Sequence, residues 1–251
     1  MGDRMIPQTI HYCWFGQNPK PDLVLECIES WRKYMPDWDI IEWNETNYDV
    51  AKCIYAQEAY EAQKWAFVSD YARFDVLKAH GGIYVDTDVE FLQSIPESIL
   101  VAKAFTGIES GGMVSPGLIF GTEPELPLIL EILDSYEGLH FDGAGSSKPQ
   151  TVNQRVTRIL ELHGFVRQDT QQRVADVDIY PAEYFCGYDQ DVHEPRVTKN
   201  TISMHHYAHS WGGSSDRVRT FLRRTLRRGV GDHAYRSLLT LKRRLFGVRG
   251  A

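Results

Sequence analysis

The sequence lacks both a long apolar run and any closely spaced pair of cysteines. No stretch of its 251 residues approaches the roughly 20 apolar residues that a membrane-spanning helix needs. The polar start Met1-Gly2-Asp3-Arg4-Met5 lacks the apolar segment of a signal peptide. The four cysteines form no Cys-x-x-Cys motif, so we interpret them as reduced, buried thiols and expect no zinc site. These absences favour a cytoplasmic protein.

Positive charge is scarce until the last part of the chain. Residues 216–251 hold eleven Lys or Arg against two Asp, a net charge of +9, whereas the whole chain has −7, so residues 1–215 carry −16. We therefore predict one domain over residues 1–215 and a basic tail over residues 216–251. Apolar residues recur at helical spacing between the arginines of the tail, which is typical of amphipathic helices.

Three partners would suit this basic helical tail. An anionic membrane surface is our first expectation, because basic amphipathic helices bind the headgroup region of bilayers. Packing on the acidic domain of the same chain is the second, since the opposite charges attract each other. Nucleic acid ranks last, and we expect none to bind, because no recognition motif accompanies the basic residues.

Hydrophobic patterning over the rest of the chain alternates between strands and helices. Short or alternating apolar runs predict strands, and apolar residues three and four apart predict helices. The predicted strands are residues 6–15, 38–43, 83–85, 112–121, 174–179 and 201–206. The predicted helices are residues 23–34, 51–63, 126–136 and 152–163, together with a helix that ends at Gly81-Gly82. This alternation indicates an α/β fold.

One segment, residues 69–88, combines a helix end with charged residues. Asp70 and Arg73 are three residues apart on the predicted helix and therefore share a face. Gly81 and Gly82 suit the end of that helix, where a left-handed backbone is needed. The pattern predicts a helix that carries Asp70 and Arg73 on one face and stops at the two glycines.

Two carboxylates follow the next strand. Ile83-Tyr84-Val85 is too short for a helix and suits a buried strand, after which come Asp86 and Asp88. In open α/β sheets, ligands bind outside the carboxyl ends of the strands. Two carboxylates this close repel each other, and a divalent cation such as Mn²⁺ or Mg²⁺ removes the repulsion while it also binds substrate phosphates. A solvated acidic turn would explain a bare Asp-x-Asp, but the whole segment favours a metal beside a sugar diphosphate.

The same segment resembles a known family. Its pattern SDxxRxxxLxxxGGxYxDxD is that of glycosyltransferases with a sugar-binding region containing the DXD motif, typified by initiating α-1,6-mannosyltransferases and capsular-polysaccharide enzymes. The matching residues are Ser69, Asp70, Arg73, Leu77, Gly81, Gly82, Tyr84, Asp86 and Asp88. Residues 6–16 also resemble the opening IPxxIHxxWxG of the family, and residues 205–211 resemble its closing HxxxxSW. A more distant similarity is to the catalytic domain of large glucosylating toxins.

The resemblance implies roles on the donor side of a site. Trp14 would stack on the nucleotide base, although an ordinary core aromatic is the alternative interpretation. Asp70 and Arg73 would hold ribose and sugar hydroxyl groups. Asp86 would contact ribose and a metal-bound water, and Asp88 would ligate the metal.

The resemblance also implies how the site closes and which fold carries it. His209 would be a further metal ligand, and Trp211 would donate to a phosphate. A separate zinc site of neighbouring histidines is disfavoured, because a strand over residues 201–206 puts His205 and His206 on opposite faces. The implied fold is GT-A, a Rossmann-like nucleotide-sugar-binding sheet flanked by helices, here followed by the basic tail. His11, on the first strand, is interpreted as a core histidine.

The resemblance implies a metal-dependent retaining hexosyltransferase. It would move a sugar from a UDP- or GDP-sugar to a glycan or lipid-linked acceptor in surface polysaccharide synthesis, as a peripheral protein at the inner face of the cell membrane. A phosphatase of the haloacid-dehalogenase type is one alternative, because residues 84–89 resemble its strand-end Asp-x-Asp-x-Val, although that class carries the motif on its first strand. A non-catalytic module that binds sugar nucleotides or membranes is the other.

Overall fold

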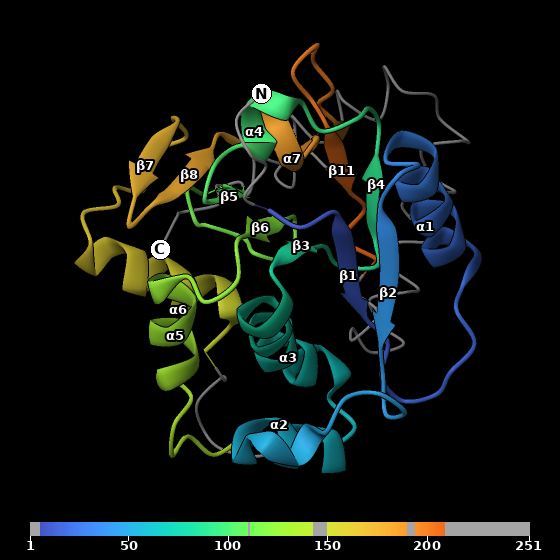
Figure 1. Cartoon of the computed structure of the whole chain (residues 1–251), viewed down its shortest axis with the longest axis vertical. Helices are drawn as coiled ribbons and strands as arrows, with labels where there is room; N and C mark the ends of the chain where they lie inside the picture. Colours follow the sequence, from blue (N-terminus) through green and yellow to red (C-terminus); the bar gives the residue numbers. More distant parts are fainter. Residues whose placement is uncertain (1–5, 110, 143–149, 190–193, 209–251) are drawn as a thin grey trace, which may run out of the picture. The chain divides into compact units, whose positions relative to one another are not determined.

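The architecture is a central sheet with helices packed against it (Figure 1). A computed structural model of the chain describes residues 6–109, 111–142, 150–189 and 194–208. The strands are β1 (Thr9–Cys13), β2 (Asp39–Trp43), β3 (Gly82–Tyr84), β4 (Val89–Phe91), β5 (Ala104–Gly107), β6 (Phe120–Thr122), β7 (Gln172–Val174), β8 (Val177–Tyr180), β9 (Tyr188–Asp189), β10 (Glu194–Pro195) and β11 (Ser203–His205). The helices are α1 (Asp22–Tyr34), the 3₁₀ turn η1 (Val50–Lys52), α2 (Ile54–Glu61), α3 (Trp65–His80), α4 (Glu97–Leu100), α5 (Pro127–Asp134), α6 (Val152–Leu162) and α7 (Ala182–Phe185).

Within the described residues, seven strands form one mixed sheet in the order β2-β1-β3-β6-β5-β8-β7. β1 pairs in parallel with both β2 and β3, and β5 pairs in parallel with β8. β6 runs antiparallel to both β3 and β5, its two neighbours. Consequently β1, β2, β3, β5 and β8 all direct their carboxyl ends to the same edge of the sheet. The segments that follow these strands are the natural place for a ligand site.

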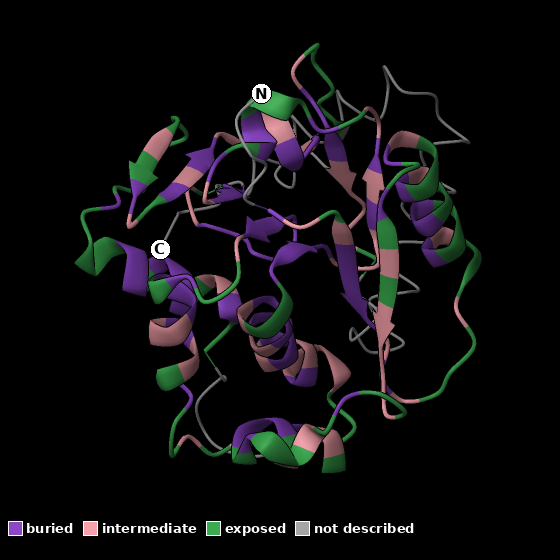
Figure 2. Cartoon of the chain, in the orientation of Figure 1, coloured by how far each residue is buried: buried purple, intermediate pink, exposed green. Residues whose placement is uncertain are grey.

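The sheet separates two hydrophobic cores, because successive side chains of a strand point to opposite faces. Helices α2, α3, α5 and α6 cover one face, and α1, α4, α7 and β4 cover the other. Tyr84 and Phe120 belong to the first core, whereas their chain neighbours Ile83 and Ile119 belong to the second. Figure 2 shows the buried residues gathered on the central strands, such as β1, β3 and β6, and on the inward faces of the helices.

The predicted α/β fold is confirmed, and its first part is a Rossmann-like β1-α1-β2 unit with parallel strands. The predicted strand over residues 112–121 is wrong for most of its length, because only Phe120–Thr122 pairs in the sheet. Residues 112–119 contain Pro116 and two glycines, which interrupt an extended run. Sequence patterns also missed β5, since four residues buried on both faces show no alternation.

Two sequence predictions fall on the end of the chain. The basic helical tail over residues 216–251, and the domain boundary before it, lie outside the described residues. Where the structure is described, it contains no helix with the length and apolar character that crossing a bilayer requires.

His11 joins the first strand to the end of α3. Its Nε2 lies 3.0 Å from the carbonyl oxygen of Gly81, and the indole Nε1 of Trp43 donates to its Nδ1 at 3.1 Å. These two contacts fit a neutral ring that carries its proton on Nε2. Gly82, with φ of +90°, has no room for a side chain, because a Cβ there would lie 2.7 Å from the carbonyl oxygen of Thr9. The interpretation of His11 as a core histidine is confirmed.

Acid should destabilise the protein through this histidine. Burial lowers the pKa of His11 from 6.5 to about 4, so the unfolded chain takes up the proton first as the pH falls. The contribution of neutral His11 to stability is complete above about pH 6.5 and is lost as the pH falls towards 4, on the order of 3 kcal/mol. We expect the free energy of unfolding in urea to fall less steeply from pH 7.5 to 4.5 in His11→Gln than in the unsubstituted protein. Parallel pH profiles would contradict this expectation.

Candidate active site

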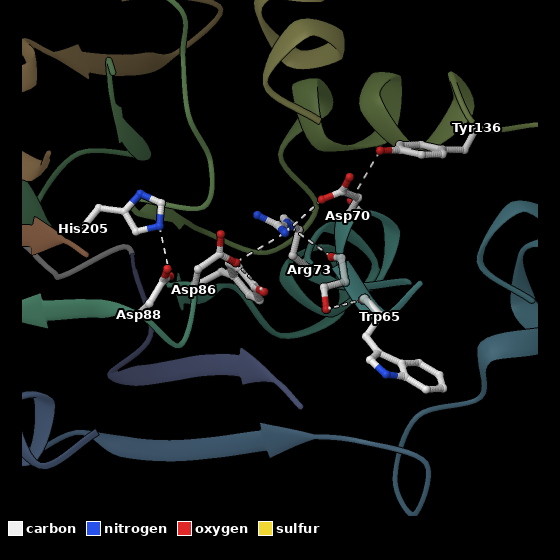
Figure 3. A network of polar contacts seen from close by, with 9 residues as sticks. Trp65, Asp70, Arg73, Asp86, Asp88, Tyr136 and His205 are labelled. Atoms are coloured by element: carbon white, nitrogen blue, oxygen red, sulfur yellow. Dashed lines mark hydrogen bonds and ion pairs between the residues drawn. The ribbon is translucent and has the colours of Figure 1, made fainter. Parts of the chain in front are cut away.

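The centre of the site is a buried guanidinium group. The side chain of Arg73, on α3, is only 3% exposed, and its Nη2 lies 3.0 Å from Oδ1 of Asp70 and 3.3 Å from Oδ1 of Asp86. Its Nε donates to the carbonyl oxygen of Ser69 at 3.0 Å, and its Cζ lies 4.7 Å from the ring centroid of Tyr84. Burial opposes the charge of Arg73, but the neighbouring anions nonetheless raise its pKa. Figure 3 shows Arg73 between the two aspartates.

Asp70 connects this cation to two other helical segments. The residue is 7% exposed, and burial raises its pKa to about 6 although Arg73 acts in the opposite direction. Its carboxylate accepts a hydrogen bond from the backbone N–H of Val152, the first residue of α6. The hydroxyl of Tyr136, just beyond α5, donates to the backbone carbonyl of Asp70 at 3.5 Å. The structure therefore brings Asp70 and Arg73 together on one face of α3, as their spacing predicts.

Asp86 lies just beyond β3, between the buried cation and solvent. The hydroxyl of Tyr84 donates to its Oδ1 at 3.0 Å, and this is the oxygen that faces Arg73. Its backbone N–H donates to the carbonyl oxygen of Gly117 at 2.9 Å. A Cβ added to Gly117 would lie 2.0 Å from Oδ2 of Asp86, so only glycine leaves room for this carboxylate. The side chain of Asp86 is 30% exposed, so a ligand at the sheet edge can reach it.

Asp88 is oriented by a histidine from far along the chain. β4 and β11 are antiparallel neighbours, with His205 opposite Val89. The imidazole Nε2 of His205 lies 2.9 Å from Oδ1 of Asp88, and the backbone N–H of His206 donates to the Asp88 carbonyl oxygen at 2.9 Å. Burial disfavours a charged His205, but the Asp88 carboxylate raises the pKa of the imidazole overall. The pairing of β4 with β11 thus holds both the side chain and the backbone of Asp88.

The two remaining predicted site residues of the closing segment cannot be placed beside these groups. His209, the predicted metal ligand, and Trp211, the predicted phosphate donor, lie outside the described residues. The histidine that the structure brings to Asp88 is His205, while His206 pairs with Glu90 at 2.8 Å.

A polar cavity of about 220 Å³ lies at the carboxyl ends of β1 and β2. Its lining residues are Trp14, Gln17, Asn18, Lys20, Glu42, Asn44, Glu45 and Thr46. The partly exposed Trp14 donates from Nε1 to the carbonyl oxygen of Asn18 at 2.7 Å. Lys20 lies over the Trp14 ring, with Nζ 5.8 Å from its centroid, and pairs with Glu42 at 2.7 Å. The cavity combines an aromatic face with charged and amide groups.

Sequence reasoning missed several contributors to the site. Gly117 follows Ser115 and Pro116 in a segment that signals only a turn, and its contact with Asp86 depends on the pairing of β3 with β6. Glu109 is a single acid in a glycine-rich segment, yet it is 8% exposed and accepts a hydrogen bond from Nδ2 of Asn153 at 2.9 Å. Neither residue has a spacing pattern that marks it.

The residues present fit a hard divalent cation. Asp86 and Asp88 offer carboxylate oxygens, which Mg²⁺ and Mn²⁺ prefer as ligands. No group of three or more His, Cys, Asp or Glu suited to a metal is found in the part of the chain that the structure describes. A pair of carboxylates is nevertheless sufficient for an ion that shares substrate phosphates and keeps several waters.

Comparison with known proteins confirms the family resemblance. Residues 21–106, from α1 through most of β5, match the family described as "Glycosyltransferase sugar-binding region containing DXD motif". Human alpha-1,4-N-acetylglucosaminyltransferase is 29% identical over 118 residues, which are 46% of this chain. The match covers 31% of the human protein, so the chain spans about a third of the length of this relative.

Solved structures of glycosyltransferases are among those that match this chain. PaToxG glycosyltransferase matches with a TM-score of 0.48 and 16% identity, over 62% of this chain and 69% of that one. The galactosyltransferase LgtC, solved with donor and acceptor sugar analogues, matches with a TM-score of 0.43 and 11% identity, over 82% of this chain and 90% of that one.

A side chain at position 117 should displace Asp86. In Gly117→Ala the new methyl group overlaps the carboxylate, and we expect the free energy of unfolding to fall by about 1–3 kcal/mol, with the hydrogen bond from Tyr84 to Asp86 lost in a crystal structure. Gly121→Ala is the matched control, because its Cβ would meet the Phe105 ring at 2.2 Å in the core instead. The control should lose stability and keep Asp86 in place. An unmoved Asp86 in Gly117→Ala would refute the steric argument.

Proposed function

We propose that the chain is a metal-dependent, retaining glycosyltransferase. The premise is that residues 21–106 match a glycosyltransferase sugar-binding region with a DXD motif. The enzyme would transfer a hexose from a UDP- or GDP-sugar to a glycan or lipid-linked glycan acceptor. The observation that carries this proposal is the buried Arg73 between Asp70 and Asp86, with Asp88 two residues further along. One fixed cation and two carboxylates thus meet at the edge of the sheet where ligands bind.

The nucleotide would lie along this edge with its base at Trp14. The cavity beside Trp14 follows β1 and β2, and the two aspartates follow β3, which is the other neighbour of β1. A base that stacks on the partly exposed indole therefore directs its diphosphate towards Asp86 and Asp88. Stacking of a base on an aromatic ring contributes about 1–3 kcal/mol to binding.

Arg73 and Asp70 would bind hydroxyl groups of the ribose or the sugar from the buried side of the site. Nη1 of Arg73 is buried and has no hydrogen-bond partner among the described residues. A buried N–H without a partner costs about 1–3 kcal/mol, so a hydroxyl group of the donor is a suitable acceptor. Tyr84 and Asp70 keep the guanidinium in place for this contact.

Asp86 and Asp88 are the residues that would hold Mn²⁺ or Mg²⁺, with His209 as the proposed third protein ligand. The bound ion would supply positive charge to the diphosphate as it leaves the sugar. His205 fixes Oδ1 of Asp88, and hydrogen bonds of this kind orient carboxylate ligands before the metal arrives. Trp211 is proposed to donate to a phosphate oxygen.

Our proposal for the acceptor rests on the basic tail and on the chemistry of a transfer that retains the anomeric configuration. In a retaining transfer the acceptor hydroxyl can approach on the side of the leaving group, so we assign no protein residue as the base. The basic residues 216–251 would hold the enzyme at the anionic inner face of the cell membrane, where lipid-linked glycans of surface polysaccharide synthesis are reached.

A screen of UDP- and GDP-sugars tests the function directly. Each compound is tested for thermal stabilisation and for slow hydrolysis, once with Mn²⁺ and once with a chelator. We expect one donor to stabilise the protein only with Mn²⁺ and to release its sugar. Phosphate release from an aryl phosphate would instead favour the phosphatase class, and donor binding without turnover would favour a non-catalytic module.

Asp88→Asn should abolish the metal-dependent reaction without unfolding the protein. The amide keeps an oxygen for His205 but loses the charge that a divalent cation needs, so we expect donor hydrolysis to fall at least about 100-fold. Glu90→Gln is the matched control, because Glu90 pairs with His206 as Asp88 pairs with His205. The control should keep most of the activity. Equal losses of donor hydrolysis in both variants would show that Asp88 is not a metal ligand.

Removal of residues 216–251 should weaken binding to anionic membranes. The tail contributes a net charge of +9, and each basic residue near an anionic surface is worth about 1 kcal/mol. Co-sedimentation with vesicles of phosphatidylglycerol and phosphatidylcholine measures the effect, and the full chain should bind more weakly as salt is added. Vesicle binding that persists in the truncated protein would assign the anchor to another part of the chain.

A further inference from the structure

Glu109 occupies, after β5, the place that Asp86 occupies after β3. Each carboxylate comes two residues beyond its strand, since β5 ends at Gly107 and β3 ends at Tyr84. β5 and β3 run in the same direction, because β6 lies between them and is antiparallel to both. The two carboxylates therefore lie at the same edge of the sheet, separated by the width of β6.

Glu109 is nearly enclosed, with 8% of the residue exposed. Its Oε1 accepts a hydrogen bond from Nδ2 of Asn153 in the first turn of α6, and the side chain of Ser115 is a second hydrogen-bond partner. Burial raises the pKa of Glu109, while the charge of His205 acts on it in the opposite direction. Glu109 thus interacts electrostatically with His205, the same residue that orients Asp88.

Backbone contacts also hold the loop after β5. The backbone N–H of Glu109 donates to the carbonyl oxygen of Met113, and Ile108 forms a β-bridge with Val114. Thr157 of α6 accepts a hydrogen bond from the backbone N–H of Val114 at 3.0 Å. Burial of a carboxylate beside neutral partners costs free energy. A nearly buried acid at the ligand edge of a sheet, held by neutral hydrogen-bond partners, is typical of a binding site.

The order of the strands indicates which part of a nucleotide sugar reaches Glu109. The Trp14 cavity lies at β1 and β2, the Asp-x-Asp follows β3, and Glu109 follows β5. β1 and β5 are three strand positions apart, roughly 14 Å, a separation that ribose and diphosphate can bridge. With the base at Trp14 and the diphosphate at the aspartates, the sugar extends towards β5.

We infer that Glu109, positioned by Asn153, accepts hydrogen bonds from hydroxyl groups of the transferred sugar and selects among sugars. The inference rests on the proposed glycosyltransferase function and adds a residue that determines its specificity. A carboxylate accepts from two hydroxyl groups at once, so it distinguishes epimers that differ in the direction of one of them. Asn153 acts through Glu109 and fixes the direction of its carboxylate.

The test separates binding of the nucleotide from binding of the sugar. Isothermal titration gives the Kd of UDP and GDP with Mn²⁺, and hydrolysis gives kcat and KM for UDP-glucose, UDP-galactose, UDP-N-acetylglucosamine and GDP-mannose. For Glu109→Gln we expect the nucleotide Kd to change less than twofold, and kcat/KM for the preferred sugar to fall roughly ten- to hundredfold. The preference between UDP-glucose and UDP-galactose should shrink. Simple loosening of the loop would instead lower kcat/KM for all of the sugar nucleotides by the same factor.

Two further variants complete the experiment. Asn153→Ala should give a smaller loss of the same kind, because the carboxylate is present but less well directed. Thr157→Val is the control, since it removes a contact between α6 and the same loop without touching Glu109, and it should keep the sugar preference. Unchanged selectivity in Glu109→Gln, or equal losses for UDP, GDP and their sugars, would overturn the inference. If the unsubstituted protein binds neither nucleotide with Mn²⁺ and hydrolyses no sugar, the proposed function fails as well.

Discussion

The site depends on one buried charge, the guanidinium group of Arg73. An uncompensated cation at this depth would be very costly, and two carboxylates and an aromatic ring compensate it. Asp70 belongs to the same helix, whereas Asp86 and Tyr84 belong to the strand and the turn after it. The requirement to pair Arg73 therefore fixes the end of β3 against α3. Gly117 leaves space for the carboxylate of Asp86 in this position, since a Cβ there would lie 2.0 Å from its Oδ2.

The first turn of α6 extends this arrangement to the other half of the sheet. The backbone N–H of Val152 donates to Asp70, and the next side chain, Asn153, donates to Glu109. The N-terminus of a helix carries unpaired N–H groups and a partial positive charge, so it suits two buried acids. Three acids on three different segments are thus held by one arginine and one helix turn. This gives the edge of the sheet a polar floor of hydrogen-bonded and ion-paired groups, and groups held in this way can orient a ligand.

Much of the fold and part of the site could be predicted from the sequence because the signals are local. The spacing of Asp70 and Arg73, the two glycines and the short apolar strand act over about 20 neighbouring residues, and the structure places all of them as expected. The strand predicted over residues 112–121 failed because Pro116 and two glycines interrupt it, so that only Phe120–Thr122 pairs in the sheet. The short strand β5 was missed because it is buried on both faces and shows no alternation. The roles of Glu109 and Gly117 could not be predicted, since each depends on pairing across β6.

The sequence by itself determined an α/β chain with an arginine, a helix stop and two carboxylates in the order of the DXD family pattern. These features follow from helical and strand periodicity, which a single segment contains completely. Only the tertiary structure decided that His205 orients Asp88 across 117 residues of chain, and that Glu109 shares an edge with Asp86. Such contacts arise from the order and direction of strands, and no local pattern records which strands become neighbours.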